Sequence, residues 1–316
     1  MLTRFVTKRS PMSTKHAFHA GERKIHQAFG IEQQMQDIGS RVIRDFMPQQ
    51  HSDFYQQLPF ILLGHVDVRG RPWASMLTGQ KNGQFIFAPD NKHLDIEASA
   101  IAGDELQYLD VGQRVGMLGI ELHTKRRNRL VAELQRDSGW QWAFSVIQSF
   151  GNCPKYIQLR ELSWIPTTER QPIRKQAIKQ LDKASKALIR QADTFFVASY
   201  FVDEQQLDLA SNGADVSHRG GEPGFVEVAD SGLLTIPDYA GNHMFSTLGN
   251  IESNGKAGLL FVDFENGHLL SMTGKAWVNW QTPQPEQYPA AERLWHFQPS
   301  QGYWLYNALP FRFSRS

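Results

Sequence analysis

The chain has 316 residues, of which 41% are hydrophobic and 21% are charged. It can therefore bury the core of one large or two ordinary domains and is not expected to be disordered. Its 33 basic and 32 acidic side chains nearly cancel, which argues against nucleic acid or an anionic membrane as a partner. No apolar run is long enough to span a bilayer. The single cysteine, Cys153, excludes a disulfide within the chain and an all-cysteine zinc site. We expect a cytoplasmic location.

The N-terminal part of the sequence is predicted to be helical. Residues 1–18 are basic but lack the apolar stretch of a secretory signal, and Met12 is an alternative start. From residue 30 to about residue 58, apolar side chains recur every three or four positions, which predicts helix interrupted at Pro48.

From Phe60 the hydrophobic period changes to that of β-strands. Predicted strands cover residues 60–66, 73–77, 85–88, 114–121, 129–134 and 142–150. Two prolines within residues 163–172 predict a linker. Residues 174–192 carry apolar side chains on one helical face and are expected to form a linker helix. A second β-rich region then runs from residue 194 to about residue 280.

Four segments of the first β-rich region recur, in the same order, in the second. The matched pairs are residues 61–67 with 197–203, Ala74-Ser75 with Ala210-Ser211, 85–90 with 233–238, and 115–122 with 257–264. Ordered matches of this kind favour an internal duplication.

The alignment leaves about a dozen extra residues in the second half, after Ala210-Ser211. They are rich in glycine and centred on Ser217-His218-Arg219-Gly220-Gly221. Glycines let backbone N–H groups approach an anion, and serine and arginine add donors. A long surface loop with turn glycines is the alternative reading.

The second half closely resembles the FMN-binding split barrels related to pyridoxamine 5′-phosphate oxidase. The residues that carry the resemblance are 215–226, 233–242, 246–264 and 269–278. The first half is similar to the same family more weakly, through residues 70–75 and 121–130, and closes with 149–160. The tandem form, with FHAGE at residues 18–22, resembles a bacterial subgroup of that family.

The resemblance implies a mainly β fold with helical decoration: two tandem FMN-binding split β-barrels that form an intrachain pseudo-dimer. The expected divisions are an N-terminal arm with helices (1–58), a first barrel (59–165), a linker helix (166–192) and a second barrel with the FMN phosphate loop (193–316). Because single barrels of this family build each site between two subunits, a cleft shared by the two barrels is expected. The chain would be a monomeric pseudo-dimer or a homodimer.

The resemblance also implies a set of FMN-binding residues. The phosphate would be held by Ser217, His218, Arg219, Gly220 and Gly221, with Asn242, His243 and Asn250 from the following loop and helix. The loop lacks the usual arginine or lysine, so Arg219 would carry most of the neutralisation. The ring would pack near Ile236, Pro237 and Asp238, and the first barrel would complete the site through Gln148, Ser149, Asn152 and Lys155. Alternatively, the segment that ends in Lys155 is merely a turn.

The expected function is that of an FMN-dependent oxidoreductase acting on an unidentified small molecule, with NAD(P)H or a reductase as electron donor. A non-enzymatic flavin-binding or electron-carrier protein is the first alternative. A haem-binding split barrel, which needs an axial ligand such as histidine, is the second. No catalytic residue is assigned, although His218 and His243 are titratable candidates. The residues that bind substrate phosphate in the vitamin-B6 oxidase are not recognisable, so oxidation of pyridoxamine phosphate is not expected.

Three further features of the sequence have alternative interpretations. The basic cluster of residues 125–129 is either a solvated strand edge or a phosphate site, and strand alternation lets at most two or three of its side chains converge. His16-x-x-His19 has a metal-compatible spacing but no clustered carboxylate or thiol, so no metal is expected. Cys153 is read as an inert thiol rather than a redox group.

Overall fold

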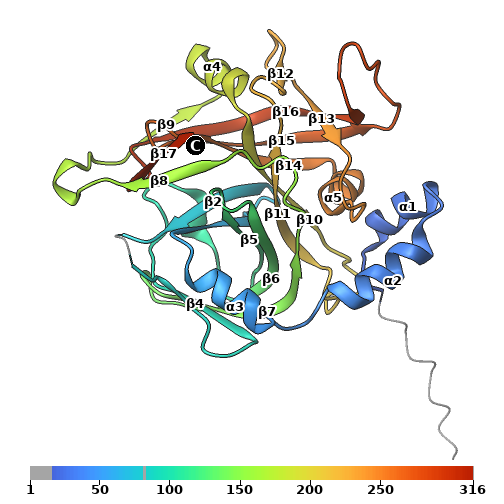
Figure 1. Ribbon diagram of the computed structural model, residues 1–316, viewed down its shortest axis with the longest axis horizontal. Coiled ribbons are helices and arrows are strands. Elements are labelled where there is room, and N and C mark those ends of the chain that lie inside the picture. The colour runs from blue at the N-terminus through green and yellow to red at the C-terminus, as the bar shows by residue number, and fades with distance from the viewer. Residues whose placement is uncertain (1–15, 81–82, 316) are drawn as a thin grey trace, which may run out of the picture.

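The computed structural model describes residues 16–80 and 83–315, and in this part the fold is mainly β, as predicted (Figure 1). The expectations for the N-terminal arm and for Met12 lie outside the described residues. A seven-stranded antiparallel sheet belongs to the first half and an eight-stranded one to the second. The first sheet contains β1 (Phe60–Val66), β2 (Pro72–Thr78), β3 (Ile86–Phe87), β4 (His93–Ile96), β5 (Arg114–Glu121), β6 (Arg126–Asp137) and β7 (Trp142–Gly151).

The second sheet repeats the strand order of the first. It contains β10 (Thr194–Phe201), β11 (Gly213–Gly220), β12 (Glu227–Val228), β13 (Leu234–Tyr239), β14 (Lys256–Asp263), β15 (His268–Asn279) and β16 (Ala291–Tyr306). The orders are β2-β1-β5-β6-β7-β4-β3 and β11-β10-β14-β15-β16-β13-β12, so each strand has a counterpart numbered nine higher. Strand β9 (Arg174–Ile178) extends the second sheet beside β16, and β8 (Arg160–Trp164) pairs with β17 (Phe311–Arg315).

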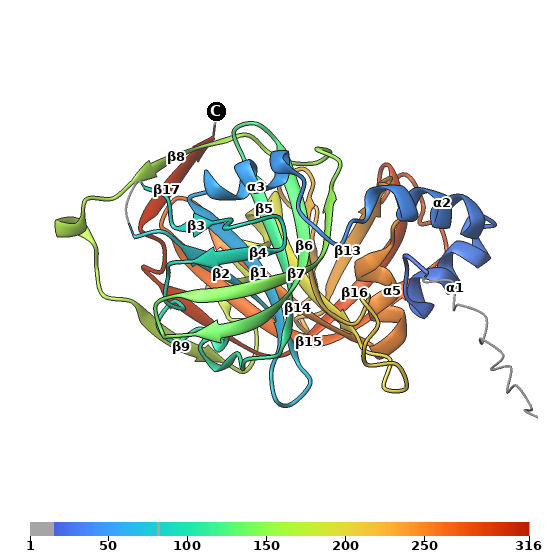
Figure 2. The same ribbon diagram turned by 90° about the horizontal axis from the view of Figure 1, so that it is seen from below.

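Helices lie at the margins of the sheets (Figure 2). They are α1 (Ala20–Ala28), α2 (Glu32–Val42), α3 (Gln49–Gln56), α4 (Lys183–Gln191) and α5 (Ser246–Asn254). The predicted restart of the helix after Pro48 is confirmed, because Pro48 immediately precedes α3. The helix before it was predicted too long, since α2 ends at Val42 and residues 43–47 are not helical. Helix α1 crosses α5 closely, since a side chain on Gly21 would overlap the backbone of Gly249. Among the described residues, no helix has both the length and the apolar character required to cross a bilayer.

The strand registers correct the sequence alignment of the two halves. Gly64 pairs with Ala74 and with Gly116, and Ala198 pairs in the same way with Val216 and Gly258. Residues 115–122 and 257–264 therefore do correspond, whereas residues 61–67 correspond to 195–201 and not to 197–203. Ala74-Ser75, however, corresponds to Val216-Ser217 and not to Ala210-Ser211.

The predicted glycine-rich insertion was therefore wrong, because the segment is strand β11 itself, paired along its length with β10. Its glycines do not mark a loop: Gly220 pairs with Thr194 in the ladder, and a side chain is excluded there because a Cβ would overlap the carbonyl oxygen of Tyr156. Residues 85–90 and 233–238 were also mismatched, since they include β3 and β13, which occupy different places in their sheets.

The predicted helix over residues 174–192 was wrong in its first part. Residues 174–178 form β9, because the backbone of β16 offers them ladder partners from Gly302 to Tyr306. The helix begins only after Asp182, whose carboxylate accepts a hydrogen bond from the Ser185 N–H at 2.8 Å. The start of the predicted linker, residues 163–164, likewise belongs to β8.

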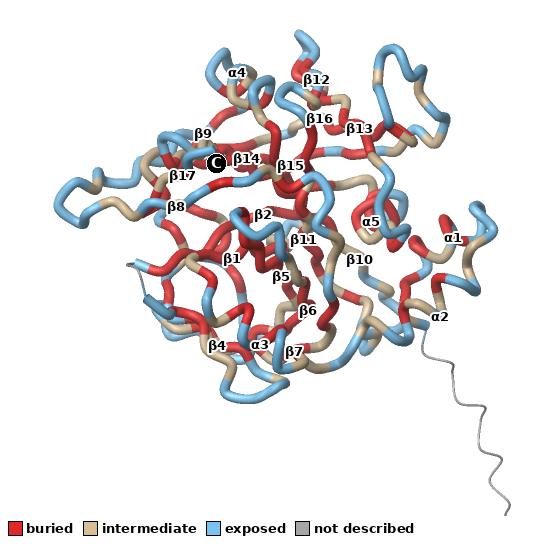
Figure 3. The backbone as a smooth tube through the Cα atoms, viewed as in Figure 1, coloured by how far each residue is buried: buried red, intermediate tan, exposed pale blue. Residues whose placement is uncertain are grey.

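The two halves pack through reciprocal crossings of backbone. A Cβ on Gly116 in β5 would overlap the Asp215 backbone of β11, and one on Gly258 in β14 would overlap the Pro72 backbone of β2. Around these crossings a shared apolar core is buried, as the colouring in Figure 3 shows. It includes Leu62, Trp73, Leu118, Phe196, Val216 and Leu260.

We expect Gly116→Ala and Gly258→Ala each to lower the free energy of unfolding by about 1–3 kcal/mol, because the added methyl group must push one half away from the other. Urea unfolding followed by tryptophan fluorescence is the measurement. Gly151→Ala is the matched control, since a Cβ there meets nothing closer than the Asn128 side chain at 3.6 Å. Equal stability of all three variants would contradict the reciprocal packing.

Candidate functional site

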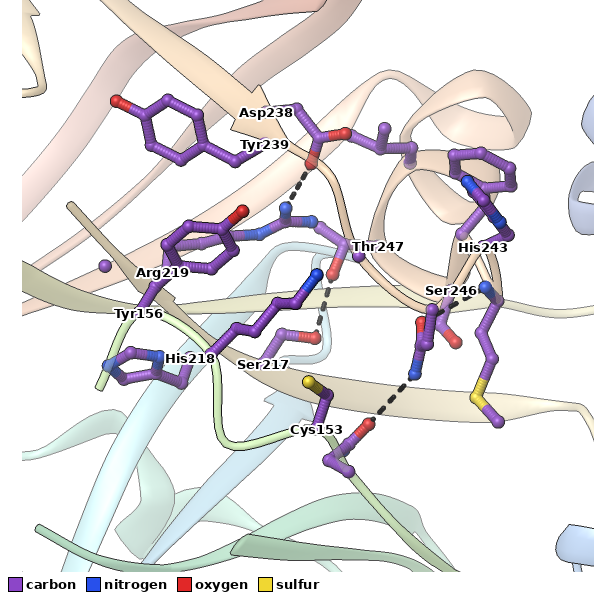
Figure 4. Close-up of a pocket in the computed structure, with 18 of the residues that line it drawn as sticks. Cys153, Tyr156, Ser217, His218, Arg219, Asp238, Tyr239, His243, Ser246 and Thr247 are labelled. Carbon is purple, nitrogen blue, oxygen red and sulfur yellow. Dashed lines mark hydrogen bonds and ion pairs between the residues drawn. The ribbon is translucent and has the colours of Figure 1, made fainter. Parts of the chain in front are cut away.

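A cleft opens where the two halves meet, between β11, β13 and the start of α5 on one side and β6 with the connection after β7 on the other (Figure 4). Its empty volume, counted with the mouth open to solvent, is about 980 Å³. The connection after β7 contacts the second half twice across the cleft. Asn242 donates to the Asn152 side chain at 3.3 Å, and the Tyr156 hydroxyl donates to the Ala240 carbonyl at 3.1 Å.

Strand β11 supplies one wall of the cleft. Because side chains alternate along a strand, Ser217 and Arg219 share a face. Thr247 of α5 donates a hydrogen bond to the Ser217 hydroxyl at 3.0 Å, which ties the strand to the helix start. His218 is buried between the halves, and burial together with the nearby Arg127 and Arg219 charges holds its pKa well below the usual range. The imidazole is therefore neutral, and its Nε2 has no hydrogen-bond partner.

Arg219 belongs to a network of fixed charges. It forms an ion pair with Asp238 of β13, and Arg293 of β16 reaches the other oxygen of the same carboxylate at 2.6 Å. Arg293 is held in turn by three aromatic rings, since its guanidinium carbon lies 5.1–5.6 Å from the ring centres of Phe29, Phe245 and Trp280. This network fixes Arg219 through Nη1 and leaves its Nε buried without a partner.

The start of α5 lies open at the cleft. His243 and Phe245, in the preceding loop, both have φ near 58°, and no side chain caps the helix. Ser246, Thr247 and Leu248 line the cleft, so the unpaired N–H groups of the first turn and the positive end of the helix dipole lie at its wall. His26 of α1 steadies the loop by donating from Nε2 to the His243 carbonyl at 2.8 Å. Such a terminus is suited to an anion.

The opposite wall carries Arg127 and Arg129 on one face of β6. Arg127 donates to the Cys153 carbonyl at 2.7 Å and to His218 Nδ1 at 3.1 Å. Burial lowers the pKa of the Arg127 guanidinium from 12.5 to about 10, so it stays charged at neutral pH. Arg129 forms a buried ion pair with Asp215, and its Nε has no partner. Neither arginine is among the predicted FMN-binding residues. The basic run 125–129 was considered as an alternative phosphate site, and a spacing of two within it would place both side chains on the same face of a strand.

The charges that line the cleft do not cancel. Five arginine and lysine side chains face two carboxylates there, and Asp215 behind Arg129 supplies a third. The excess of two positive charges is close to the charge of one phosphate monoester, about −1.5 to −2. The cleft is therefore electrostatically complementary to a phosphorylated ligand.

Ten of the predicted cofactor residues line this cleft. They are Asn152, Lys155, Ser217, His218, Arg219, Gly220, Pro237, Asp238, Asn242 and His243. Cys153 also lines the cleft. Among the described residues, no group of side chains is suited to bind a metal ion, and this includes His16 and His19.

The five other predicted residues do not line the cleft. Ile236 is fully buried in the core of the second half, and Gly221 packs against Phe225. Ser149 is buried, and its hydroxyl is hydrogen-bonded to His51 Nδ1 at 2.8 Å. Gln148 and Asn250 line a smaller adjoining hollow, because their elements pass behind the Arg129–Asp215 pair rather than beside Arg219.

That adjoining hollow contains a buried acid, Glu22 of α1. Its carboxylate accepts a hydrogen bond from the His19 N–H at 2.9 Å and lies near Asp215 and Arg129. Burial raises the pKa of the Glu22 carboxyl from 4.5 to about 8. Burial also lowers the pKa of the neighbouring His19 to about 3. At neutral pH the carboxyl is therefore protonated and the imidazole neutral, so the α1–α5 contact carries little charge.

Glu22 should make the stability of the protein depend on pH. Between pH 4.5 and about 8 the folded chain keeps a proton that the unfolded chain releases, so the contribution of Glu22 to stability falls as the pH rises through this window. Each pH unit costs about 1.4 kcal/mol. We expect Glu22→Gln to gain about 2–3 kcal/mol relative to wild type between pH 5 and pH 7. Urea unfolding at both pH values measures this, and parallel pH profiles would contradict it; His19 is common to both chains and cancels.

The repeated strand order gives His218, Arg219 and Arg127 of the cleft counterparts in the other half, and these counterparts are apolar. His218 and Arg219 correspond to Met76 and Leu77 of β2, because both pairs follow the serines matched by the registers. Arg127 lies opposite Ile120, and its counterpart Leu269 lies opposite Val262. Met76, Leu77 and Leu269 are fully buried. Met76 and Leu269 belong to the shared core together with Phe311 and Phe313 of β17. The position that corresponds to the cleft is therefore filled by apolar side chains.

Comparisons with known proteins give matches to solved structures alone. No protein-family model matches the sequence, and no curated protein is significantly similar to it. One similar structure is HupZ from group A Streptococcus (18% identity, 38% of this chain and 90% of that chain, TM-score 0.28). Another is the haem storage protein HutZ from Vibrio cholerae (16%, 40% and 95%, 0.27). A third is a candidate pyridoxamine 5′-phosphate oxidase from Lactobacillus delbrueckii (11%, 34% and 95%, 0.27). Each similarity spans two fifths of this chain or less, at a TM-score that says nothing about ligand or activity.

Proposed function

We propose that the chain binds FMN in this cleft and acts as an FMN-dependent oxidoreductase on an unidentified small molecule. The observation that carries the proposal is a set of buried polar atoms without hydrogen-bond partners: Arg129 Nε, Arg219 Nε and His218 Nε2. They line a cleft with an uncapped helix start and an excess of two positive charges. A buried donor without a partner costs about 1–3 kcal/mol, so a ligand that accepts these bonds would be strongly favoured.

In this proposal the protein's residues bind and orient the cofactor. Arg219, Ser217 and the first turn of α5 would hold the phosphate, with Lys155 reaching in from the first half. Arg127 would keep His218 neutral and in place. The bound flavin would supply hydride or electron transfer, which the side chains of the cleft do not provide themselves.

The same strand order in both sheets, with reciprocal crossings at Gly116 and Gly258, supports a tandem pair of split barrels arranged as an intrachain pseudo-dimer. In such an arrangement a chain could hold two equivalent clefts. The apolar Leu77 and Leu269 in place of Arg219 and Arg127 instead favour one ligand per chain.

Haem binding is the second candidate function, and one observation favours it. His218 is a neutral imidazole at the cleft whose Nε2 has no partner, and neutral imidazole is the form of histidine that ligates a metal. Because Nδ1 accepts from Arg127, the proton lies on Nε2, so the ring would have to change tautomer before Nε2 could ligate a metal. The cationic cleft would also suit the carboxylates of a haem. Burial of His218 to 6% exposure requires the ring to turn before it could reach such a ligand, and we therefore place haem second.

Titration of the apoprotein with FMN and with riboflavin tests the proposed function. The two ligands share the ring system and differ in the phosphate, so the cleft should bind FMN at least about thirtyfold more tightly, because riboflavin lacks the charge-assisted contact of Arg219. Quenching of flavin fluorescence gives both affinities. Equal affinities would contradict a phosphate-binding cleft, and haemin binding without flavin binding would favour the second candidate.

A further inference from the structure

Another hollow, separate from the one that contains Glu22, adjoins the cleft on the side of the first half. It lies between α3, the turn from β5 to β6 and the connection after β7, and it has about 740 Å³ of empty volume, including its open side. We call it the basic shelf, lined by Gln50, His51, residues 124–128, Gly151, Asn152 and Pro154. Arg127 and Asn152 line both the shelf and the cleft, so the two hollows are contiguous.

The cations of the shelf have no acidic partners. In the described part of the chain, no carboxylate forms an ion pair with Lys125, Arg126 or Arg127. Glu121 is opposite Arg126 in the ladder, yet its carboxylate accepts hydrogen bonds from the Gln57 and Thr124 side chains instead. Three adjacent cations thus remain uncompensated.

The shelf is also ordered before any ligand arrives. The guanidinium carbon of Arg126 lies 4.9 Å from the centre of the Phe54 ring, a cation–π contact that limits its rotation. Thr124 accepts a hydrogen bond from the Arg126 N–H at 3.3 Å, and Lys125 sits at the tip of the turn with φ 60°. Burial, with the nearby Arg44 and Arg126 charges, lowers the pKa of His51.

Protection of a free sheet edge does not explain these charges. Lysine and arginine often guard exposed edge strands against pairing with another chain. Strand β6, however, is an inner strand, paired with β5 from Arg126 on and with β7 from Asn128 on. The Arg127 carbonyl also accepts from the Asn152 N–H at 3.2 Å, so only Lys125 and Arg126 lie beyond that pairing. This stretch is too short to pair with another chain, and its uncompensated charge calls for another explanation.

We propose that the shelf binds the diphosphate of a nicotinamide dinucleotide that serves as electron donor to the cleft. This inference rests on the proposed function. The excess charge of the cleft is matched by the phosphate of one FMN, whereas Lys125 and Arg126 add two further positive charges beyond it. A diphosphate seated there, with Arg127 between the two hollows, belongs to a molecule whose other end can enter the cleft.

Equilibrium binding of NADP⁺, NAD⁺ and inorganic pyrophosphate to the FMN-loaded protein, by isothermal titration calorimetry, tests the proposal. The oxidised dinucleotides avoid turnover during the measurement. The double variant Lys125→Gln/Arg126→Gln should weaken all three roughly ten- to a hundred-fold, because each lost contact is charge-assisted. Its affinity for FMN should stay within about twofold of wild type.

The matched control is Arg136→Gln/Lys275→Gln, which removes two exposed charges from β6 and β15 far from the shelf and leaves the same net charge. Its affinities should equal those of wild type. Undiminished binding to the shelf variant, an equal loss in the control, or an equal loss of FMN affinity would each overturn the proposal. Binding of pyrophosphate without either dinucleotide would overturn the dinucleotide assignment. Pyrophosphate titration of the apoprotein separates failure of the shelf from failure of the proposed function, since it needs no flavin.

Discussion

Replacing Arg219 with alanine is expected to weaken FMN binding about thirty- to a hundred-fold, or about 2–3 kcal/mol. The change removes the unpartnered Nε–H and one positive charge from the cleft. It also leaves Asp238 with Arg293 as its remaining cation, so a less compensated carboxylate would face the phosphate. Flavin fluorescence titration of the apoprotein measures the loss.

Arg136→Ala is the control, because this side chain is exposed at the far end of β6. Arg219→Lys should recover part of the affinity, since it restores the charge without the guanidinium geometry. An Arg219→Ala protein that retained flavin through extensive dialysis as well as wild type would rule out the phosphate-binding role.

Replacing Arg129 with alanine is expected to lower the free energy of unfolding by about 3–5 kcal/mol. Arg129 of β6 and Asp215 of β11 form an ion pair between the halves, with side chains 7% and 12% exposed. Removing the arginine leaves a carboxylate buried between the sheets without its counter-charge. The guanidinium also lies 5.4 Å from the centre of the Phe150 ring, and this contact would be lost as well.

A double-mutant cycle separates the ion pair from the lost packing. Arg129→Ala/Asp215→Ala should be less destabilised than the sum of the two single variants, because the double variant buries no unpaired charge. Urea unfolding at neutral pH gives the four free energies. Strict additivity would mean that the pair does not couple the two halves.

Hydrophobic patterning was sufficient to predict the bounds of two inner strands that are buried on both faces. Residues 60–66 and 114–121 were predicted with the bounds that β1 and β5 have. The same patterning failed for a strand whose conformation depends on backbone pairing rather than on burial. Residues 174–178 of β9 have a single buried member, Ile178, and their strand conformation depends on ladder bonds to β16. No local pattern records a partner more than a hundred residues away.

The candidate site was predicted in part for a similar reason. Ser217 and Arg219 stand in a segment with a recognisable resemblance, so the wall from the second half could be anticipated. Arg127 and Arg129 belong to a basic run whose reading depends on what lies opposite it. The structure places β11 and His218 there, a juxtaposition of residues about ninety positions apart.

The number of flavins bound per chain tests the central claim most directly. The purified protein, saturated with FMN and freed of excess ligand, should show a flavin spectrum with one FMN per chain, since Leu77 and Leu269 occupy the places of Arg219 and Arg127 in the other half. Protein concentration from amino-acid analysis and flavin concentration after release by acid give the ratio. Two flavins per chain would contradict the asymmetry, and a Soret band with no flavin would contradict the FMN cleft itself.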